Sequence, residues 1–208
     1  MGRRARRLWF VLTAIALAAV LAVPAASARV GSGRSLLPSC GATSQPFMLW
    51  ADTASYCAFP NLGFESGSTA WTLTGNASVI LANEPWHVSG AGTHALQLAP
   101  GSSALSSPLP VNLFDPWVRF FARTNGATGP LRVQVIFRGL LGNLTGLLNM
   151  GTLYPSSYSG WQPTQRVLSL LALPLGTKTA QVLLTSQATS GSWRVDDVYL
   201  DPRISKVG

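Results

Sequence analysis

The stretch LRVQVIFRG, residues 131–139, alternates apolar and polar side chains over most of its length, and this alternation indicates the fold class. The apolar positions of one parity are Leu131, Val133, Val135 and Phe137. The other parity holds Arg132, Gln134, Ile136 and Arg138. Because successive side chains of a strand point to opposite faces, the stretch predicts a β-strand with one buried face and one mostly polar face.

Short runs on both sides of this stretch give the same signal. TAQVLLT (179–185) alternates, and Ala180, Val182 and Leu184 are predicted to face inward. HALQLAPGSSALSSPLPV (94–111) predicts a strand, a tight turn and a second strand. FRGLLGNLTGLLNMG (137–151) has four glycines, which favour strand–turn–strand over a helix. Further strand candidates are SVILA (78–82), WVRFFAR (117–123), RVLSLLAL (166–173) and SWRVDDVYL (192–200).

About nine or ten short strands separated by turn residues are typical of an all-β domain. No stretch beyond residue 28 repeats apolar residues with the 3.6-residue period of a helix. We therefore predict an antiparallel β-sandwich or jelly roll over residues 58–208.

The first 28 residues predict a secretory signal peptide rather than a part of the fold. MGRRARR is basic, Leu8 to Val23 is apolar, and Pro24 and the small residues of ASA (26–28) follow. The alternative is a membrane anchor, but the apolar run is shorter than the about 20 residues that a spanning helix needs. We expect a secreted, extracellular protein, with a flexible leader at residues 29–39 and no membrane partner after cleavage.

The charge of the chain belongs in part to this segment. The sequence has 15 basic and seven acidic residues, and four of the basic residues fall in the first 28. The remaining chain therefore carries 11 basic against seven acidic residues, a net charge of +4. Because the basic residues are scattered without a cluster, we expect no nucleic-acid partner.

Two cysteines, Cys40 and Cys57, lie beyond the predicted cleavage site. In an exported chain such a pair indicates one disulfide, which would close residues 40–57 into an N-terminal segment. Free or metal-bound thiols are the alternative, but no further Cys or His lies nearby to complete a metal site. The sequence leaves open whether this segment covers a sheet edge, extends a strand or meets a partner.

Three motifs resemble, in the same order, those of secreted carbohydrate-binding modules of the family 4, 9 and 22 type. They are PNLGFESGSTAWTLTG (60–75), SGWQPTQRVLSL (159–170) and GSWRVDDVYLDP (191–202). The resemblance implies a galactose-binding-like jelly roll. The stretches SCGATSQPFMLWADTASYCAFPNLGFE (39–65) and NEPWHVSGAGTHAL (83–96) resemble more closely a group of uncharacterised secreted proteins from high-GC bacteria, which implies the same fold and no known activity.

The resemblance also implies a structural calcium ion. In the related modules, calcium often joins two segments. One contains the glutamate that follows the phenylalanine of the first motif, and the other is the terminal strand with the sequence Asp-Asp-Val. Here those residues are Glu65 and Asp196 or Asp197, and oxygen ligands of this kind suit calcium. A bulge would change which aspartate faces the ion, and we favour Asp196. The alternative is that Glu65 pairs with an arginine or caps a turn.

Ligand contacts are predicted from aromatic and polar side chains. Sugar rings stack on exposed aromatic rings, and Trp71, Trp161 and Trp193 lie in motifs where an aromatic supports the core. The candidate exposed rings are Trp86, Tyr154 and Tyr158, although packing is the usual fate of such residues. Arg132, Gln134 and Arg138 are candidates to bond sugar hydroxyls or the carboxylate of an acidic glycan, the alternative being a solvated sheet face.

Catalysis has little support in the sequence. A glycosidase needs two positioned carboxylates, and four of the seven acidic residues lie in or beside fold motifs. Glu84, His87 and His94 would form an acid–base or metal site only if they converged. We therefore predict a non-catalytic secreted module that binds a polysaccharide or cell-surface glycan. The alternative is a cell-envelope structural or protein-interaction module without a sugar site.

Overall fold

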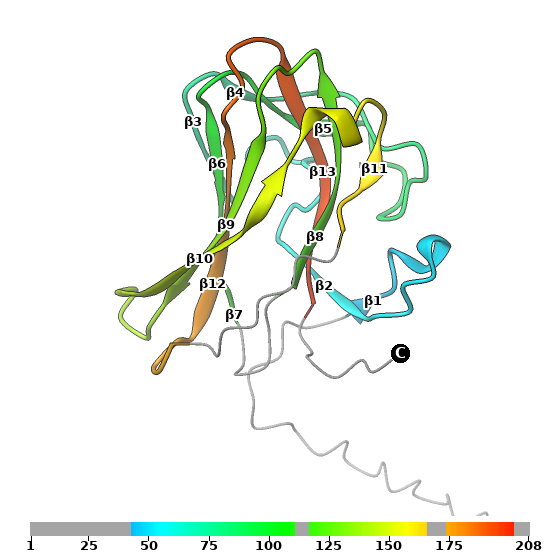
Figure 1. The fold of residues 1–208 in the computed structure, drawn as a ribbon. Helices are drawn as coiled ribbons and strands as arrows, with labels where there is room; N and C mark the ends of the chain where they lie inside the picture. The colour runs from blue at the N-terminus through cyan, green and yellow to red at the C-terminus, as the bar shows by residue number, and fades with distance from the viewer. Residues whose placement is uncertain (1–42, 111–116, 166–173, 202–208) are drawn as a thin grey trace, which may run out of the picture. The chain divides into compact units, whose positions relative to one another are not determined.

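Two antiparallel sheets pack against each other in the computed structural model, which describes residues 43–110, 117–165 and 174–201 (Figure 1). These residues belong to one compact unit, Ser35–Gly208. The predicted antiparallel β-sandwich is confirmed. The described residues form 13 strands, of which three have only two residues, close to the nine or ten that were predicted.

The first sheet is built around β13, its longest strand. Along one edge β13 pairs with β8, and along the other it pairs first with β5 and then with β2. β4 pairs with β5, β1 with β2, and β11 with β8. The strands of this sheet are β1 (Thr43–Ser44), β2 (Tyr56–Ala58), β4 (Ala77–Leu81), β5 (His94–Leu98), β8 (Trp117–Asn125), β11 (Gln162–Pro163) and β13 (Ser192–Asp201).

The second sheet has the order β10-β9-β12-β6-β3, with β7 also paired to β12. Its strands are β3 (Trp71–Thr74), β6 (Ser103–Ser106), β7 (Leu109–Pro110), β9 (Leu131–Arg138), β10 (Leu144–Leu153) and β12 (Thr179–Ser186). Two short 3-10 helices lie outside the sheets, η1 (Met48–Trp50) and η2 (Pro155–Ser157). Within the described residues, no helix is long and apolar enough to cross a membrane.

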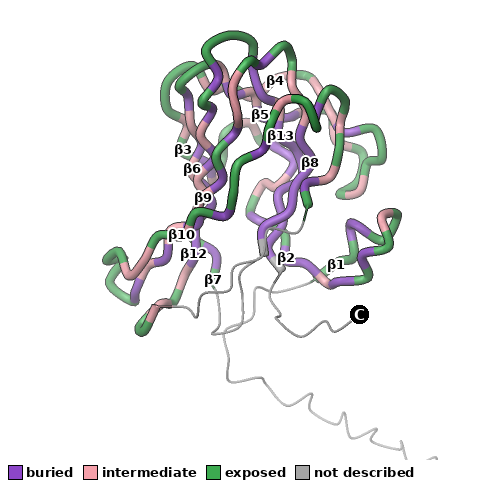
Figure 2. Tube along the Cα trace, in the orientation of Figure 1, coloured by how far each residue is buried: buried purple, intermediate pink, exposed green. Residues whose placement is uncertain are grey.

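The main core lies between the two sheets, where the alternating strands bury their apolar faces (Figure 2). The four predicted inward positions of β9 are buried, as are Ala180, Val182 and Leu184 of β12. Trp71 and Trp193 are also buried in this core, as predicted. The stretch 94–111 does give a strand, a turn and a strand, but β5 and β6 belong to different sheets, so the turn crosses the sandwich.

The N-terminal segment forms a second core on the outer side of the first sheet. Phe47, from this segment, stacks on Phe121 of β8 with ring centroids 5.4 Å apart. Arg119 of β8 forms a buried ion pair with Asp52, and its guanidinium also lies 4.1 Å over the Phe47 ring. Tyr56 donates a 2.6 Å hydrogen bond to the same carboxylate. The segment thus extends the sheet through β1 and β2 and covers part of its face.

Several predictions fall on residues outside the described ranges. They concern the signal peptide (1–28), the leader (29–39), Cys40 and the candidate strand at 166–173. Cys57 is buried in β2. Because Cys40 lies outside the described residues, the disulfide stays a prediction.

Candidate functional site

A polar pocket lies on the outer face of the second sheet, between β9 and β10. Its volume is about 330 Å³, and its lining residues are Arg132, Gln134, Asn149, Gly151 and Thr152. We call it the sheet-face pocket. Two of the residues predicted to contact a ligand, Arg132 and Gln134, therefore lie together in it. The other three were not predicted.

A β-bulge in β10 shapes this pocket. Asn149 is the partner of Gln134 and Gly151 is the partner of Val133, so Met150 is an extra residue and turns into the core. Gly151 has a φ of 137°, which glycine adopts without strain. Because Gly151 also lacks a side chain, the pocket stays open above the backbone.

The polar groups of the pocket differ in how they are held. Gln134 Nε2 donates a 2.8 Å hydrogen bond to Asn149 Oδ1, which fixes both amides. The Arg132 side chain is exposed, and its guanidinium makes no hydrogen bond or ion pair with any described residue. Arg132 thus offers free donors beside a fixed pair of amides, an arrangement that suits a polar ligand with an acidic group.

The remaining candidate ligand residues are placed differently. Arg138 does not line the pocket, because its Nε donates to Gln181 Oε1 and its Nη1 donates to the carbonyl of Gly142. Tyr154 directly follows β10, two residues after Thr152, and this candidate residue is 63% exposed. Tyr158, another candidate ring, follows the alternative of packing and is unsuited to bind a ligand: it is buried edge-on against Trp193, with ring centroids 5.8 Å apart.

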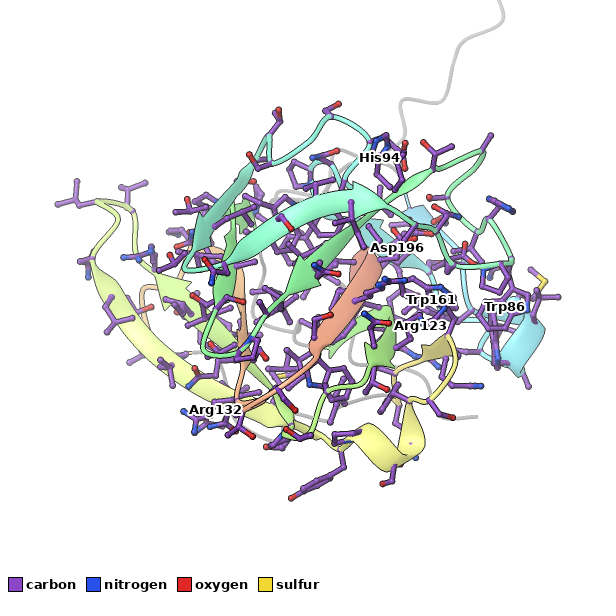
Figure 3. The ribbon with its side chains drawn as sticks, turned by 90° about the horizontal axis from the view of Figure 1, so that it is seen from above. Trp86, His94, Arg123, Arg132, Trp161 and Asp196 are labelled. Carbon is purple, nitrogen blue, oxygen red and sulfur yellow. The ribbon has the colours of Figure 1, made fainter. Side chains whose placement is uncertain are left out.

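Trp86 lies on the other side of the sandwich from Arg132 (Figure 3). It is partly exposed, but its ring packs edge-on against Trp50, with centroids 4.9 Å apart, and against Phe121. Trp161 is only half buried and packs against the same aromatic cluster. Trp86 therefore belongs to the packing of the N-terminal segment and does not contribute to the sheet-face pocket.

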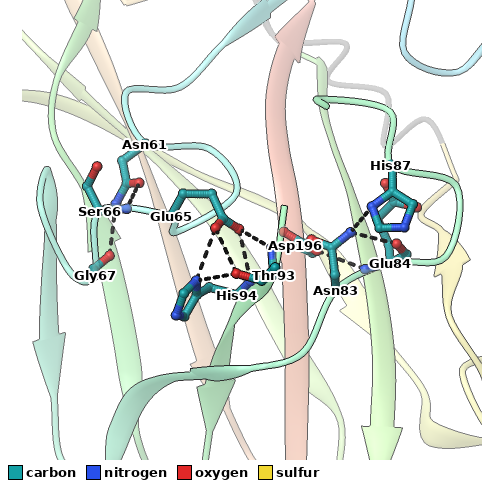
Figure 4. A network of polar contacts seen from close by, with 10 residues as sticks. All are labelled: Asn61, Glu65, Ser66, Gly67, Asn83, Glu84, His87, Thr93, His94 and Asp196. Carbon is teal, nitrogen blue, oxygen red and sulfur yellow. Dashed lines mark hydrogen bonds and ion pairs between the residues drawn. The ribbon is translucent and has the colours of Figure 1, made fainter. Parts of the chain in front are cut away.

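Three carboxylates are buried together where the first and last motifs meet: Glu84, Asp196 and Asp197. The amide of Glu84 donates to Asp196 Oδ2 at 2.9 Å (Figure 4). The amide of Asp197 donates to Asp196 Oδ1 at 2.9 Å. The Asp197 side chain also contacts Ser89 and Glu84. Glu84 in turn accepts hydrogen bonds from the amides of Trp86 and Val88.

A bulge in β13 brings both aspartates into this cluster. The register of β13 against β8 shifts between Asp196 and Tyr199, and Asp197 has a φ of 51°. Strand alternation left open whether Asp196 or Asp197 faces the cluster. Because of the bulge, both side chains are buried in it. Burial raises the pKa of Asp196 to about 9, and the neighbouring Asp197 adds to the shift. Burial likewise raises the pKa of Asp197 to about 6, with the nearby Glu84 charge as a further cause.

Backbone contacts join the first motif to the last. Val198 N donates to Leu62 O at 3.2 Å, and Phe59 N donates to Val198 O at 3.1 Å. A Cβ on Gly63 would lie 3.0 Å from Asp197 Oδ1, closer than an ordinary contact, so glycine allows this approach. These backbone groups therefore join the two ends of the domain in the described residues, whereas the predicted calcium link through Glu65 stays a prediction.

Glu65 has partners other than Asp196. Its carboxylate accepts hydrogen bonds from the amides of Thr93 and His94, at 2.8 and 2.9 Å, and lies 3.0 Å from His94 Nδ1 (Figure 4). These contacts lower the pKa of Glu65, although its partial burial acts in the opposite direction. Glu65 thus fastens the loop of the first motif to the start of β5.

The oxygen ligands of the acidic cluster suit calcium chemically, but their arrangement is not that of a metal site. Among the described residues, no group of three or more His, Cys, Asp or Glu side chains is placed to hold a metal ion. The carboxylates of Glu84 and Asp196 accept hydrogen bonds from backbone amides, which a bound cation would have to displace in part.

The residues considered for catalysis have separate partners. His87 Nδ1 lies 3.0 Å from Asn83 Nδ2, whereas His94 lies beside Glu65. The lining of the sheet-face pocket includes no carboxylate, histidine or cysteine. It therefore lacks the pair of carboxylates that glycoside hydrolysis requires.

Comparisons with known proteins gave similarities to solved structures only. No family model and no curated protein matches the chain. An arabinose-bound GH51 α-L-arabinofuranosidase is 15% identical over 70% of this chain, with a TM-score of 0.49, and the match covers 26% of that chain. TmCBM61 in complex with β-1,4-galactotriose is 15% identical over 69% of this chain and 97% of its own, with a TM-score of 0.42.

The CBM22-1 xylan-binding domain of Paenibacillus barcinonensis Xyn10C is 16% identical over 69% of this chain and 93% of its own, with a TM-score of 0.44. Carbohydrate-binding modules are thus among the solved structures similar to this chain, as the sequence motifs predicted. At these identities and TM-scores, the similarity does not identify a ligand of this chain. The predicted kinship to secreted proteins of high-GC bacteria has no support among these matches and stays a prediction.

Proposed function

We propose that the chain is a non-catalytic glycan-binding module whose ligand occupies the sheet-face pocket. The observation that carries the proposal is the free guanidinium of Arg132 next to the hydrogen-bonded amides of Gln134 and Asn149, above a floor of Gly151. A hollow of about 330 Å³ with a few convergent polar groups has the size of a small-molecule site.

The chemistry of the pocket favours an acidic sugar. Arg132 is its only charged side chain, and a guanidinium binds a carboxylate or sulfate through two parallel hydrogen bonds. The chain has no Asp or Glu between Asp115 and Asp196, so no acidic residue in that long stretch offsets the positive charge of Arg132. The exposed Tyr154 ring, at the end of β10, supplies an apolar surface on which a sugar ring can stack.

The signal-peptide pattern supports action at or outside the cell surface, after removal of residues 1–28. We further propose that calcium binds the acidic cluster in a rearranged form. In that form the carboxylates of Asp196, Asp197 and Glu84 exchange part of their hydrogen bonds to backbone amides for the ion, and Glu84 takes the place predicted for Glu65. A divalent cation would favour the ionised form of these side chains, whose burial, together with the neighbouring charges, raises the pKa of both aspartates.

A carbohydrate array tests the proposed function. We expect the protein to bind polysaccharides that contain uronic acid or sulfate groups, and to bind their neutral counterparts less tightly. Absence of binding to both neutral and acidic polysaccharides would contradict a glycan-binding function and favour a structural module.

A further inference from the structure

The hairpin between β9 and β10 ends in exposed leucines. Leu140 and Leu141 are 82% and 92% exposed, and Leu144 and Leu147 on β10 are at least half exposed. Two hydrogen bonds define the turn: Gly139 N donates to Asn143 O, and Gly142 N donates to Gly139 O. Large apolar side chains gathered at one exposed place are typical of a contact surface rather than of scattered surface residues.

A second turn adds to the same surface. Leu175, which precedes β12, is 95% exposed. Its turn is joined to the hairpin, because Thr177 Oγ1 lies 2.9 Å from Thr145 Oγ1 and Lys178 N donates to Arg138 O at 2.8 Å. Both turns protrude at the same end of the second sheet (Figures 1 and 2). We call this surface the leucine tip, made of Leu140, Leu141, Leu144, Leu147 and Leu175.

Among the residues that the structure describes, the charged side chains behind the leucine tip are basic. Arg138 ends β9 and Lys178 directly precedes β12, and the Arg138 side chain is held at the base of the turn by its bonds to Gln181 and Gly142. No acidic residue occurs in the sequence between Asp115 and Asp196. A second copy of the chain docked tip to tip would bring these like charges together, which disfavours self-association as the use of this surface.

We propose that the leucine tip docks on the surface of an anionic lipid bilayer. Apolar side chains flanked by basic ones suit such a surface, because the leucines enter the interfacial region while Arg138 and Lys178 meet the lipid phosphates. The contact is interfacial and needs no spanning helix. The sequence predicted no membrane partner after signal cleavage, so this proposal adds a lipid partner.

Hydrogen–deuterium exchange of the full chain, with and without vesicles, tests this proposal. With vesicles of phosphatidylcholine and phosphatidylglycerol, we expect slower exchange at residues 139–147 and 174–178. The double variant Leu140→Ser/Leu141→Ser should lose this protection and bind the vesicles at least about tenfold more weakly. Lys178→Gln should weaken vesicle binding about fivefold. Leu81→Ser, at an equally exposed leucine of the first sheet, is the matched control and should change nothing.

Four results would overturn the proposal. The first is that vesicles leave hydrogen exchange of the wild type unchanged, and the second is that vesicles still slow exchange at the tip of the double variant. The third is that pure phosphatidylcholine vesicles slow exchange at the tip as strongly as the anionic vesicles do. The fourth is that, without vesicles, exchange at the tip becomes slower as the protein concentration rises. The last result would assign the tip to a second copy of the chain. The apolar run near the N-terminus is the same in every variant. Exchange rates measured at individual segments therefore distinguish vesicle binding through the leucine tip from vesicle binding through that run.

Discussion

Asp196 Oδ2 accepts a 2.9 Å hydrogen bond from the backbone amide of Glu84, 112 residues away in the sequence. The bond lies where β13 has passed its pairing with β5 and has not yet begun its pairing with β2. At this point a hydrogen bond to a buried carboxylate therefore takes the place of backbone pairing between strands. Two further carboxylates share this place, so the closure of the domain depends on the charge of the cluster.

Stability should fall as the pH rises from about 5 to 8 in the presence of a chelator. The pKa values of Asp196 and Asp197, about 9 and about 6, exceed the ordinary value of an aspartate, so the folded state holds protons that the unfolded state releases. The melting temperature should therefore decrease over this range, and Asp197→Asn should flatten the decrease. A wild-type melting temperature that rises from pH 5 to 8 would contradict the account of the cluster.

Calcium should raise the melting temperature at pH 7.5 relative to the chelator. A bound cation offsets the repulsion among the carboxylates and binds only the folded state, so stability increases with its concentration. Asp196→Asn should abolish the increase, whereas Asp52→Asn, which changes a carboxylate outside the cluster, should retain it. Equal wild-type melting temperatures in calcium and chelator would exclude the proposed site.

Replacement of Glu65 by alanine should destabilise the domain by about 1 kcal/mol, because the amides of Thr93 and His94 lose their acceptor. The partial exposure of the carboxylate limits the effect. Because the folded pKa is lowered, this contribution is present above the ordinary pKa of a glutamate and is lost as the pH falls through the folded value. Urea unfolding at pH 7 measures the loss, with Ser66→Ala as the control; no difference between the two variants would refute this role.

Arg119→Ala should cost about 3–5 kcal/mol in the free energy of unfolding, because it leaves the buried carboxylate of Asp52 without its cation. It also removes the contact with the Phe47 ring that holds the N-terminal segment on the sheet. Arg123→Ala, on the same strand but without an ion pair among the described residues, should cost less than about 1 kcal/mol. Similar losses for both variants would show that the ion pair does not anchor the segment.

The sequence predicted those parts of the site that depend on local alternation. Arg132 and Gln134 lie on the outer face because β9 is a regular strand. Asn149 and Thr152 escaped prediction because the extra residue Met150 shifts the parity of β10, and a bulge leaves no clear sequence signal.

Long-range contacts set the other limits of sequence-based prediction. Glu84 joins the acidic cluster through tertiary contacts with Asp196 and Asp197, so no local pattern identifies it. Tyr158 lies in a stretch rich in Pro, Ser and Gly that favours exposure, yet packing against Trp193 buries it. The face of a strand on which a side chain lies was therefore predictable from the sequence, whereas the contacts of a loop residue were not.

Titration calorimetry with the best acidic ligand from the array tests whether Arg132 binds a glycan in the sheet-face pocket. The wild type and Arg123→Ala should bind with the same affinity, whereas Arg132→Ala should bind at least about tenfold more weakly, because a charge-assisted bidentate contact is lost. All three proteins should have closely similar melting temperatures, since both arginines lie outside the core. Equal affinity of Arg132→Ala and the wild type would contradict the assignment of the sheet-face pocket as the glycan site.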